Sequence, residues 1–125
     1  MEPAKYVFAL MIVGLLSAKP TYAQNPAEGQ KLYVTYCASC HGDTGKGNGA
    51  AANALPVKPA DHTNGAEMNR LTDKFLREII SKGGPAVGKS SMMPGWGSNL
   101  TDRQVSDLVA YIRSIAQPPY KASAK

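Results

Sequence analysis

Tyr36-Cys37-Ala38-Ser39-Cys40-His41-Gly42 (YCASCHG) contains both cysteines of the chain and one of its two histidines. Three kinds of site use so dense a cluster: a redox-active dithiol, a metal site, and an attachment point for a cofactor. These sites differ in what the rest of the chain must supply. The sequence on either side therefore decides among them.

The first 23 residues differ in composition from the rest of the chain. Lys5 precedes an apolar run from Tyr6 to Leu16, and the segment ends at Ala23 after small and polar residues. This pattern is typical of a secretory signal peptide, and it predicts cleavage after Ala23. A membrane anchor would need about 20 apolar residues, and Lys19 and Pro20 interrupt the run too early; retention of the uncleaved segment remains an alternative. We expect residues 24–125 to form one exported, periplasmic domain.

Charge and size limit the functions that this domain can have. The chain of 125 residues carries a formal net charge of +5, without a dense run of arginine or lysine. A nucleic-acid grip is therefore not expected, whereas an acidic protein partner or the anionic face of a membrane fits this charge. Aromatic core material is scarce, and domains of this size often need a covalent staple or a cofactor.

Two interpretations of the cysteine pair find little support elsewhere in the chain. An exported pair normally forms a disulfide, but a bridge between Cys37 and Cys40 would close a loop too short to stabilise the fold much. A thioredoxin-like dithiol requires a βαβ unit, and no alternating strand pattern occurs here. Zinc normally takes four ligands, and the sequence adds only His62 as a further histidine.

Two helices are predicted in the first two thirds of the domain. One spans about residues 26–36, with Pro26 suited to its first turn. The next begins after Thr72, a good N-cap, and carries a hydrophobic staple between Leu71 and Leu76. Gly83-Gly84-Pro85 should end it, because glycine accepts the left-handed conformation that commonly follows a helix.

A third helix has the clearest start signal in the sequence. Thr101 and Gln104 form a capping box, and apolar residues then repeat with helical spacing as far as Ile115. Pro118-Pro119 should stop this helix. We predict an all-α single domain with three main helices.

A Cys-x-x-Cys-His sequence explains Cys37, Cys40 and His41 together, as the attachment site of a c-type haem. Two thiols one short turn apart can add to the two vinyl groups of the porphyrin. The next residue then presents its imidazole to the iron. We therefore expect one covalent haem c, with Cys37 and Cys40 forming thioethers and His41 as the proximal ligand.

At this point the chain resembles the class I cytochromes c over nearly all of residues 24–125. The resemblance rests on Gly29 and Tyr33 at four-residue spacing before the YCASCHG stretch, a methionine loop, and a final amphipathic helix near Tyr111. It implies the cytochrome c fold, with three main helices around the haem. It also implies that Gly29 and Tyr33 pack near Tyr111, where the first and last helices cross.

The sixth iron ligand is expected in the loop of residues 89–96. Met92 and Met93 both lie there, and the resemblance favours Met93 because the ligand of the family commonly precedes a proline, as Met93 precedes Pro94. Met68 and His62 are weaker alternatives, and His62 is expected to face solvent. A thioether ligand stabilises ferrous iron and raises the reduction potential.

Other residues around the haem are assigned less specifically. A backbone carbonyl must orient the proximal imidazole, and the resemblance places it in the segment 55–61, at Pro56 or Pro59. Trp96 could donate to a haem propionate or only cover the pocket by packing. Four lysines could form a docking surface around the haem edge, although scattered surface lysines usually have no such role: Lys46, Lys58, Lys82 and Lys89.

Closed His/Met coordination leaves no site for a substrate, and no Ser/His/Asp set or carboxylate pair indicates catalysis. We therefore expect an electron-transfer protein, not an enzyme, that exchanges electrons with a donor and an acceptor protein whose docking surfaces are acidic. It would be a monomer or a complex subunit, with peripheral membrane association as an option. The alternatives are a haem c subunit of a membrane-associated oxidase or dehydrogenase complex, and a ligand sensor or peroxidase with open iron.

Overall fold

The computed structural model describes residues 22–122, so residues 1–21 of the predicted signal peptide lie outside it. The elements in chain order are α1 (Pro26–Tyr36), α2 (Ala38–His41), the 3-10 turn η1 (Ala52–Ala54), α3 (Gly65–Met68), α4 (Asp73–Lys82), the 3-10 turn η2 (Gly84–Val87) and α5 (Asp102–Ile115). The only β pairing among the described residues is an isolated bridge between Asn64 and Gln117. The predicted all-α fold is therefore confirmed. None of the helices in residues 22–122 has the length and apolar character that crossing a membrane requires.

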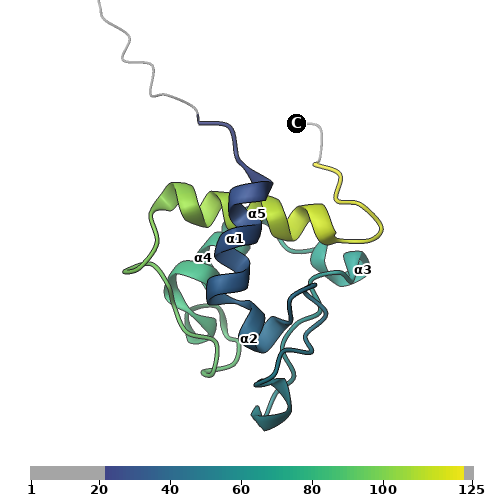
Figure 1. Cartoon of the computed structure of the whole chain (residues 1–125), viewed down its shortest axis with the longest axis vertical. Helices are drawn as coiled ribbons and strands as arrows, with labels where there is room; N and C mark the ends of the chain where they lie inside the picture. The colour runs from purple at the N-terminus through teal and green to yellow at the C-terminus, as the bar shows by residue number, and fades with distance from the viewer. Residues whose placement is uncertain (1–21, 123–125) are drawn as a thin grey trace, which may run out of the picture.

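Helix α1 passes in front of α5 and crosses it in the upper part of the view in Figure 1. The crossing is close because Gly29 has no side chain: a Cβ atom there would overlap the backbone carbonyl of Asp107 and lie 2.9 Å from Cβ of Tyr111. Beside it the rings of Tyr33 and Tyr111 meet edge to face, with their centroids 5.1 Å apart. The predicted packing of Gly29 and Tyr33 against the Tyr111 region is confirmed.

Local capping sets where the longer helices begin. The Asn25 side chain accepts hydrogen bonds from the first turn of α1, and Thr72 Oγ1 accepts from the backbone N–H of Phe75 in α4 at 3.1 Å. Thr101 and Gln104 form the predicted capping box at the start of α5. Each of these side chains satisfies helix N–H groups that have no partner within the helix.

The end of α5 agrees with the apolar pattern, which repeats as far as Ile115 and is followed by Pro118-Pro119. The helix ends at Ile115, and Ala116 is extended, with φ −69° and ψ 133°. The next residue explains this: the N–H of Gln117 donates to Thr63 at 2.9 Å, and its carbonyl accepts from Gly65 at 2.9 Å. This backbone pairing draws the chain out of the helix before the prolines are reached.

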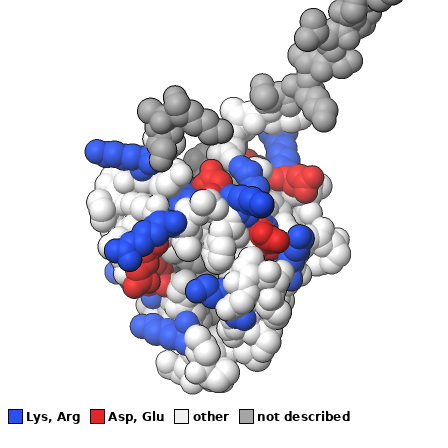
Figure 2. All heavy atoms as spheres, turned by 180° about the vertical axis from the view of Figure 1, so that it is seen from behind, with Lys and Arg blue, Asp and Glu red and all other residues white. Residues whose placement is uncertain are grey.

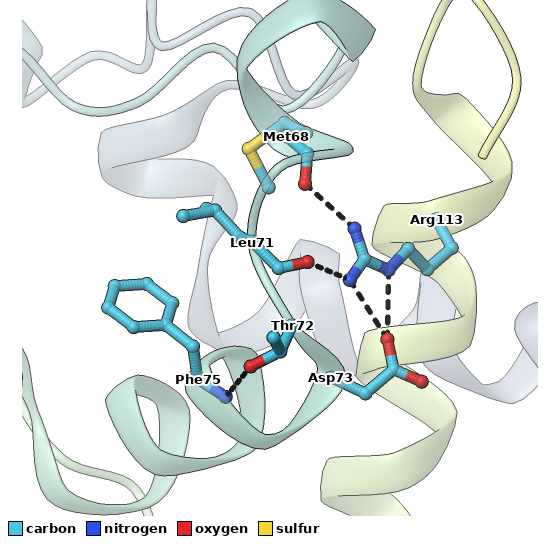
Figure 3. A network of polar contacts seen from close by, with 6 residues as sticks. All are labelled: Met68, Leu71, Thr72, Asp73, Phe75 and Arg113. Carbon is cyan, nitrogen blue, oxygen red and sulfur yellow. Dashed lines mark hydrogen bonds and ion pairs between the residues drawn. The ribbon is translucent and has the colours of Figure 1, made fainter. Parts of the chain in front are cut away.

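Arg113 joins α5 to the turn between α3 and α4 (Figure 3). Its Nη1 and Nη2 groups donate to the carbonyls of Met68 at 2.8 Å and Leu71 at 2.5 Å, and its Nε donates to Asp73 Oδ1 at 3.0 Å. The Arg113 side chain is only 9% exposed. A planar guanidinium with several fixed donors suits this arrangement better than the single ammonium of lysine would.

Candidate haem-binding site

The short helix α2 brings the two cysteines and His41 onto one turn of the chain. Cys37 ends α1 and begins α2, and its carbonyl accepts from the N–H groups of Cys40 at 3.2 Å and His41 at 2.9 Å. Cys37 and His41 are buried, Cys40 is partly exposed, and neither cysteine is in a disulfide. The three side chains predicted for haem attachment therefore lie together.

The orientation of His41 is set by a backbone carbonyl. His41 Nδ1 lies 3.0 Å from the carbonyl oxygen of Ala60, so Nδ1 carries the proton and donates it, and Nε2 is left unprotonated and able to bind a metal. The expected segment is correct, but the expected residue was wrong: the acceptor belongs to Ala60 and not to Pro56 or Pro59. Burial lowers the pKa of His41, and the hydrogen bond to Ala60 opposes that shift.

His62 is not the solvent-facing loop residue that the sequence suggested. Its ring is partly buried and stacks on the ring of His41, with centroids 4.2 Å apart and an interplanar angle of 19°. Its Nδ1 lies 2.8 Å from the hydroxyl of Tyr33. Burial first, and the neighbouring His41 second, lower the pKa of His62 to about 3. No local sequence pattern predicts this contact, because Tyr33, His41 and His62 lie in three separate segments.

The glycine-rich stretch after His41 folds back against α2 and the segment before His62. The N–H of Gly47 donates to the His41 carbonyl at 2.7 Å, and the carbonyl of Gly45 accepts from the N–H of His62 at 2.7 Å. Gly47 has a φ of 73°, and a Cβ atom there would lie 2.5 Å from the Pro59 carbonyl. We call residues 37–62, which carry both histidines, the proximal segment.

The predicted methionine ligand lies on a loop attached to the end of α4; we call residues 88–97 the methionine loop. The carbonyl of Met93 accepts from Gly84 at 2.9 Å, and the N–H of Trp96 donates to Ile80 at 2.8 Å. The Met92 side chain is 52% exposed, whereas Met93 is partly buried. Met68 packs within the hydrophobic core. Ligation by Met93 remains a prediction.

The other residues singled out from the sequence lie around these segments. Trp96 meets the Tyr36 ring edge to face, with centroids 5.1 Å apart. The four candidate docking lysines are all exposed, and Lys82 pairs with Glu78 at 3.2 Å. On the face shown in Figure 2, basic side chains are interleaved with acidic ones.

The donor set fits covalent haem better than the alternatives. Burial and the neighbouring Cys40 raise the pKa of the Cys37 thiol to about 12, whereas a redox-active dithiol needs a lowered thiol pKa. Residues 22–122 hold no cluster of three or more His, Cys, Asp or Glu side chains arranged for a metal ion. Two adjacent thiols and one oriented imidazole are what thioether attachment and a single iron bond require.

The sequence matches the family model described as cytochrome c oxidase, cbb3-type, subunit III, over residues 24–112. It is 29% identical to the cbb3-type cytochrome c oxidase subunit CcoP of Azospirillum sp. (strain B510), over 80% of this chain and 32% of that protein. The chain thus spans about a third of the length of this relative.

Smaller cytochromes match over most of their length. Cytochrome c6 of Synechococcus sp. is 31% identical, over 90% of this chain and 91% of that protein. Among solved structures, the KustC0563 c-type cytochrome has a TM-score of 0.57 and 27% identity, and the match covers 71% of this chain and 98% of that chain. The chain therefore belongs to the cytochrome c family, as an electron-transfer domain that carries covalently bound haem c.

Proposed function

We propose that residues 24–125 form a periplasmic one-electron carrier whose haem is attached through Cys37 and Cys40 and ligated by His41 and Met93. The observation that carries the proposal is the His41–Ala60 hydrogen bond next to two free thiols. This bond keeps the proton on Nδ1 and leaves Nε2 for iron. A histidine in a merely structural role would not need one nitrogen kept free beside a pair of cysteines.

When bound, the haem supplies a ferric/ferrous couple that accepts or gives one electron. The chain's own residues hold and insulate that couple. Cys37 and Cys40 would hold the haem through thioether bonds, His41 would bind its iron through Nε2, and the thioether of Met93 would supply a soft ligand that favours the reduced state. An iron held by both His41 and Met93 would have no position for a substrate, which is the reason to propose electron transfer and no catalysis.

Export to the periplasm and docking to acidic surfaces on partner proteins are part of the same proposal. The apolar run before Ala23 supports export. The net charge of +5 and the exposed Lys46, Lys58 and Lys89 support docking to acidic surfaces on a donor and an acceptor.

A haem subunit of a larger oxidase complex is the second candidate, and the family match with CcoP favours it. The two candidates use the same chemistry and differ in assembly. Size-exclusion chromatography of the exported protein from its native membrane and soluble fractions separates them. A carrier elutes alone and monomeric, whereas a subunit remains with larger chains.

A potentiometric titration tests the proposed function, combined with a haem stain of the denatured protein on a gel. We expect the stain to follow the polypeptide, and the visible spectrum to convert reversibly with one electron per chain. Rapid peroxide consumption or carbon monoxide binding by the ferrous protein would contradict the closed coordination. A missing stain would contradict covalent attachment.

A further inference from the structure

His62 is a polar, partly buried side chain that the electron-carrier function does not explain. Burying an imidazole away from water has a free-energy cost unless hydrogen bonds replace those to solvent. An apolar residue would fill the same space without that cost. The contacts of His62 indicate what the imidazole does instead.

Three contacts fix the position of His62. Its backbone N–H donates to Gly45 at 2.7 Å, and its Nδ1 lies 2.8 Å from the Tyr33 hydroxyl. Tyr33 is fully buried at the crossing of α1 and α5, where its ring packs against that of Tyr111, so the hydroxyl is carried by a ring held in the core. The third contact is the stack on His41, at 4.2 Å and 19°. The ring is therefore held by its edge and presents its face to His41.

The stack supplies a restraint that the Ala60 carbonyl cannot. One hydrogen bond at Nδ1 fixes that corner of the His41 imidazole but lets the ring rock about the line of the bond. A flat ring held against its face opposes this motion. The two contacts together fix both the position and the plane of His41.

We propose that His62 is a positioning residue that sets the plane of the His41 imidazole, with the Tyr33 hydroxyl holding His62 in place. This inference rests on the proposed function, in which His41 ligates iron. The plane of an axial imidazole determines how unpaired spin is distributed over a ferric haem. A change in that plane therefore alters the paramagnetic shifts of the four haem methyl groups.

The stack also argues against His62 as an iron ligand itself. A ring stacked on His41 would lie on the same side of a bound haem as His41. Replacement of His62 should therefore leave the axial ligands unchanged.

Proton NMR of the purified ferric holoprotein tests the proposal. Tyr33→Phe and His62→Phe each remove the same hydrogen bond while keeping an aromatic ring. We expect both to change the spread of the haem-methyl shifts in the same direction, and the double variant to change it no further than either single variant. His62→Leu, which also removes the ring, should change it most. Tyr36→Phe, a matched change on α1 at a hydroxyl with no hydrogen bond among the described residues, should leave it as in the parent.

Each outcome decides between the alternatives. Parent-like methyl shifts in both Tyr33→Phe and His62→Phe, or additive changes in the double variant, would overturn the positioning role. Loss of the low-spin ferric spectrum in His62→Phe would show that His62 is itself a ligand. If His62→Leu fails to accumulate, the two phenylalanine variants still decide. Absence of covalent haem from the parent protein would instead sink the proposed function, and a haem stain shows that separately.

Discussion

The proximal segment and the methionine loop are held in place by different kinds of contact. In the proximal segment, side chains are fixed directly: His41 Nδ1 by the Ala60 carbonyl, and His62 by the Tyr33 hydroxyl. The methionine loop is attached to the end of α4 by backbone hydrogen bonds, such as that from Gly84 to the Met93 carbonyl. Changes in the proximal segment should therefore affect attachment and orientation of the haem. Changes in the methionine loop should affect the sixth ligand while the haem stays in place.

The largest expected effect comes from removing both thiols. The double variant Cys37→Ala, Cys40→Ala should lose all covalent haem, because no sulfur remains to form a thioether. A haem stain of the denatured protein measures this. Ser39→Ala, between the two cysteines, is the control and should stain like the parent. A stain that persists in the double variant would contradict the assigned attachment.

Replacing the sixth ligand should change the coordination and leave the haem attached. Met93→Leu conserves volume and should keep the stain, lose the weak long-red ferric band of iron–methionine coordination, lower the reduction potential and allow ferrous carbon monoxide binding. Met92→Leu is the matched control and should keep the band. The opposite pattern, with the band lost only in Met92→Leu, would assign the ligand to Met92.

A smaller effect is expected from disturbing the attachment of the loop. Gly84→Ala places a Cβ atom into the Ser90 carbonyl, and such overpacking costs about 1–3 kcal/mol. We expect a weaker long-red band, undiminished haem stain and a lower unfolding free energy in chemical denaturation.

Gly88→Asn is the control for this change. Gly88 has a φ of 71° with open space around a Cβ atom, and asparagine tolerates this conformation. A normal band in Gly84→Ala would show that the loop does not depend on this contact.

The smallest effect is expected from a change at Arg113, which should leave both the proximal segment and the methionine loop unaffected. Arg113→Lys keeps the charge but leaves the Met68 and Leu71 carbonyls without their shared donor (Figure 3). We expect a loss of about 1–2 kcal/mol in the unfolding free energy, with haem stain and ferric band retained. Arg70→Lys, at an exposed position in the same turn, should have parent stability. Equal stability of the two variants would contradict the role of Arg113.

Features with a local cause could be predicted from the sequence. Pro26 marks the first turn of α1, and Thr72 and the Thr101–Gln104 capping box mark the starts of α4 and α5. Gly83 was expected in the left-handed conformation; it has the positive φ, 88°, but its ψ of 172° lies outside that region. The short helix α3 was not predicted, because four residues are too few to show helical periodicity. The pairing of Gln117 with Thr63, just after α5, was not predicted, because these residues lie far apart in the chain.

The candidate site shows the same division. The Cys-x-x-Cys-His motif occupies five consecutive residues, so haem attachment through Cys37, Cys40 and His41 could be predicted from their spacing alone. The acceptor at Ala60 could be placed only to within a segment, because that choice depends on how the loop turns back. The position of His62 depends on two other segments, and treating it as a solvent-facing residue was wrong for that reason.

The visible spectrum of the exported ferric and ferrous protein, with and without carbon monoxide, tests the central claim most directly. A six-coordinate His/Met carrier predicts the weak long-red band in the ferric state and a ferrous spectrum that carbon monoxide does not change. A ferric spectrum without that band, together with a carbon monoxide adduct, would mean an open iron and would contradict the assignment as an electron carrier.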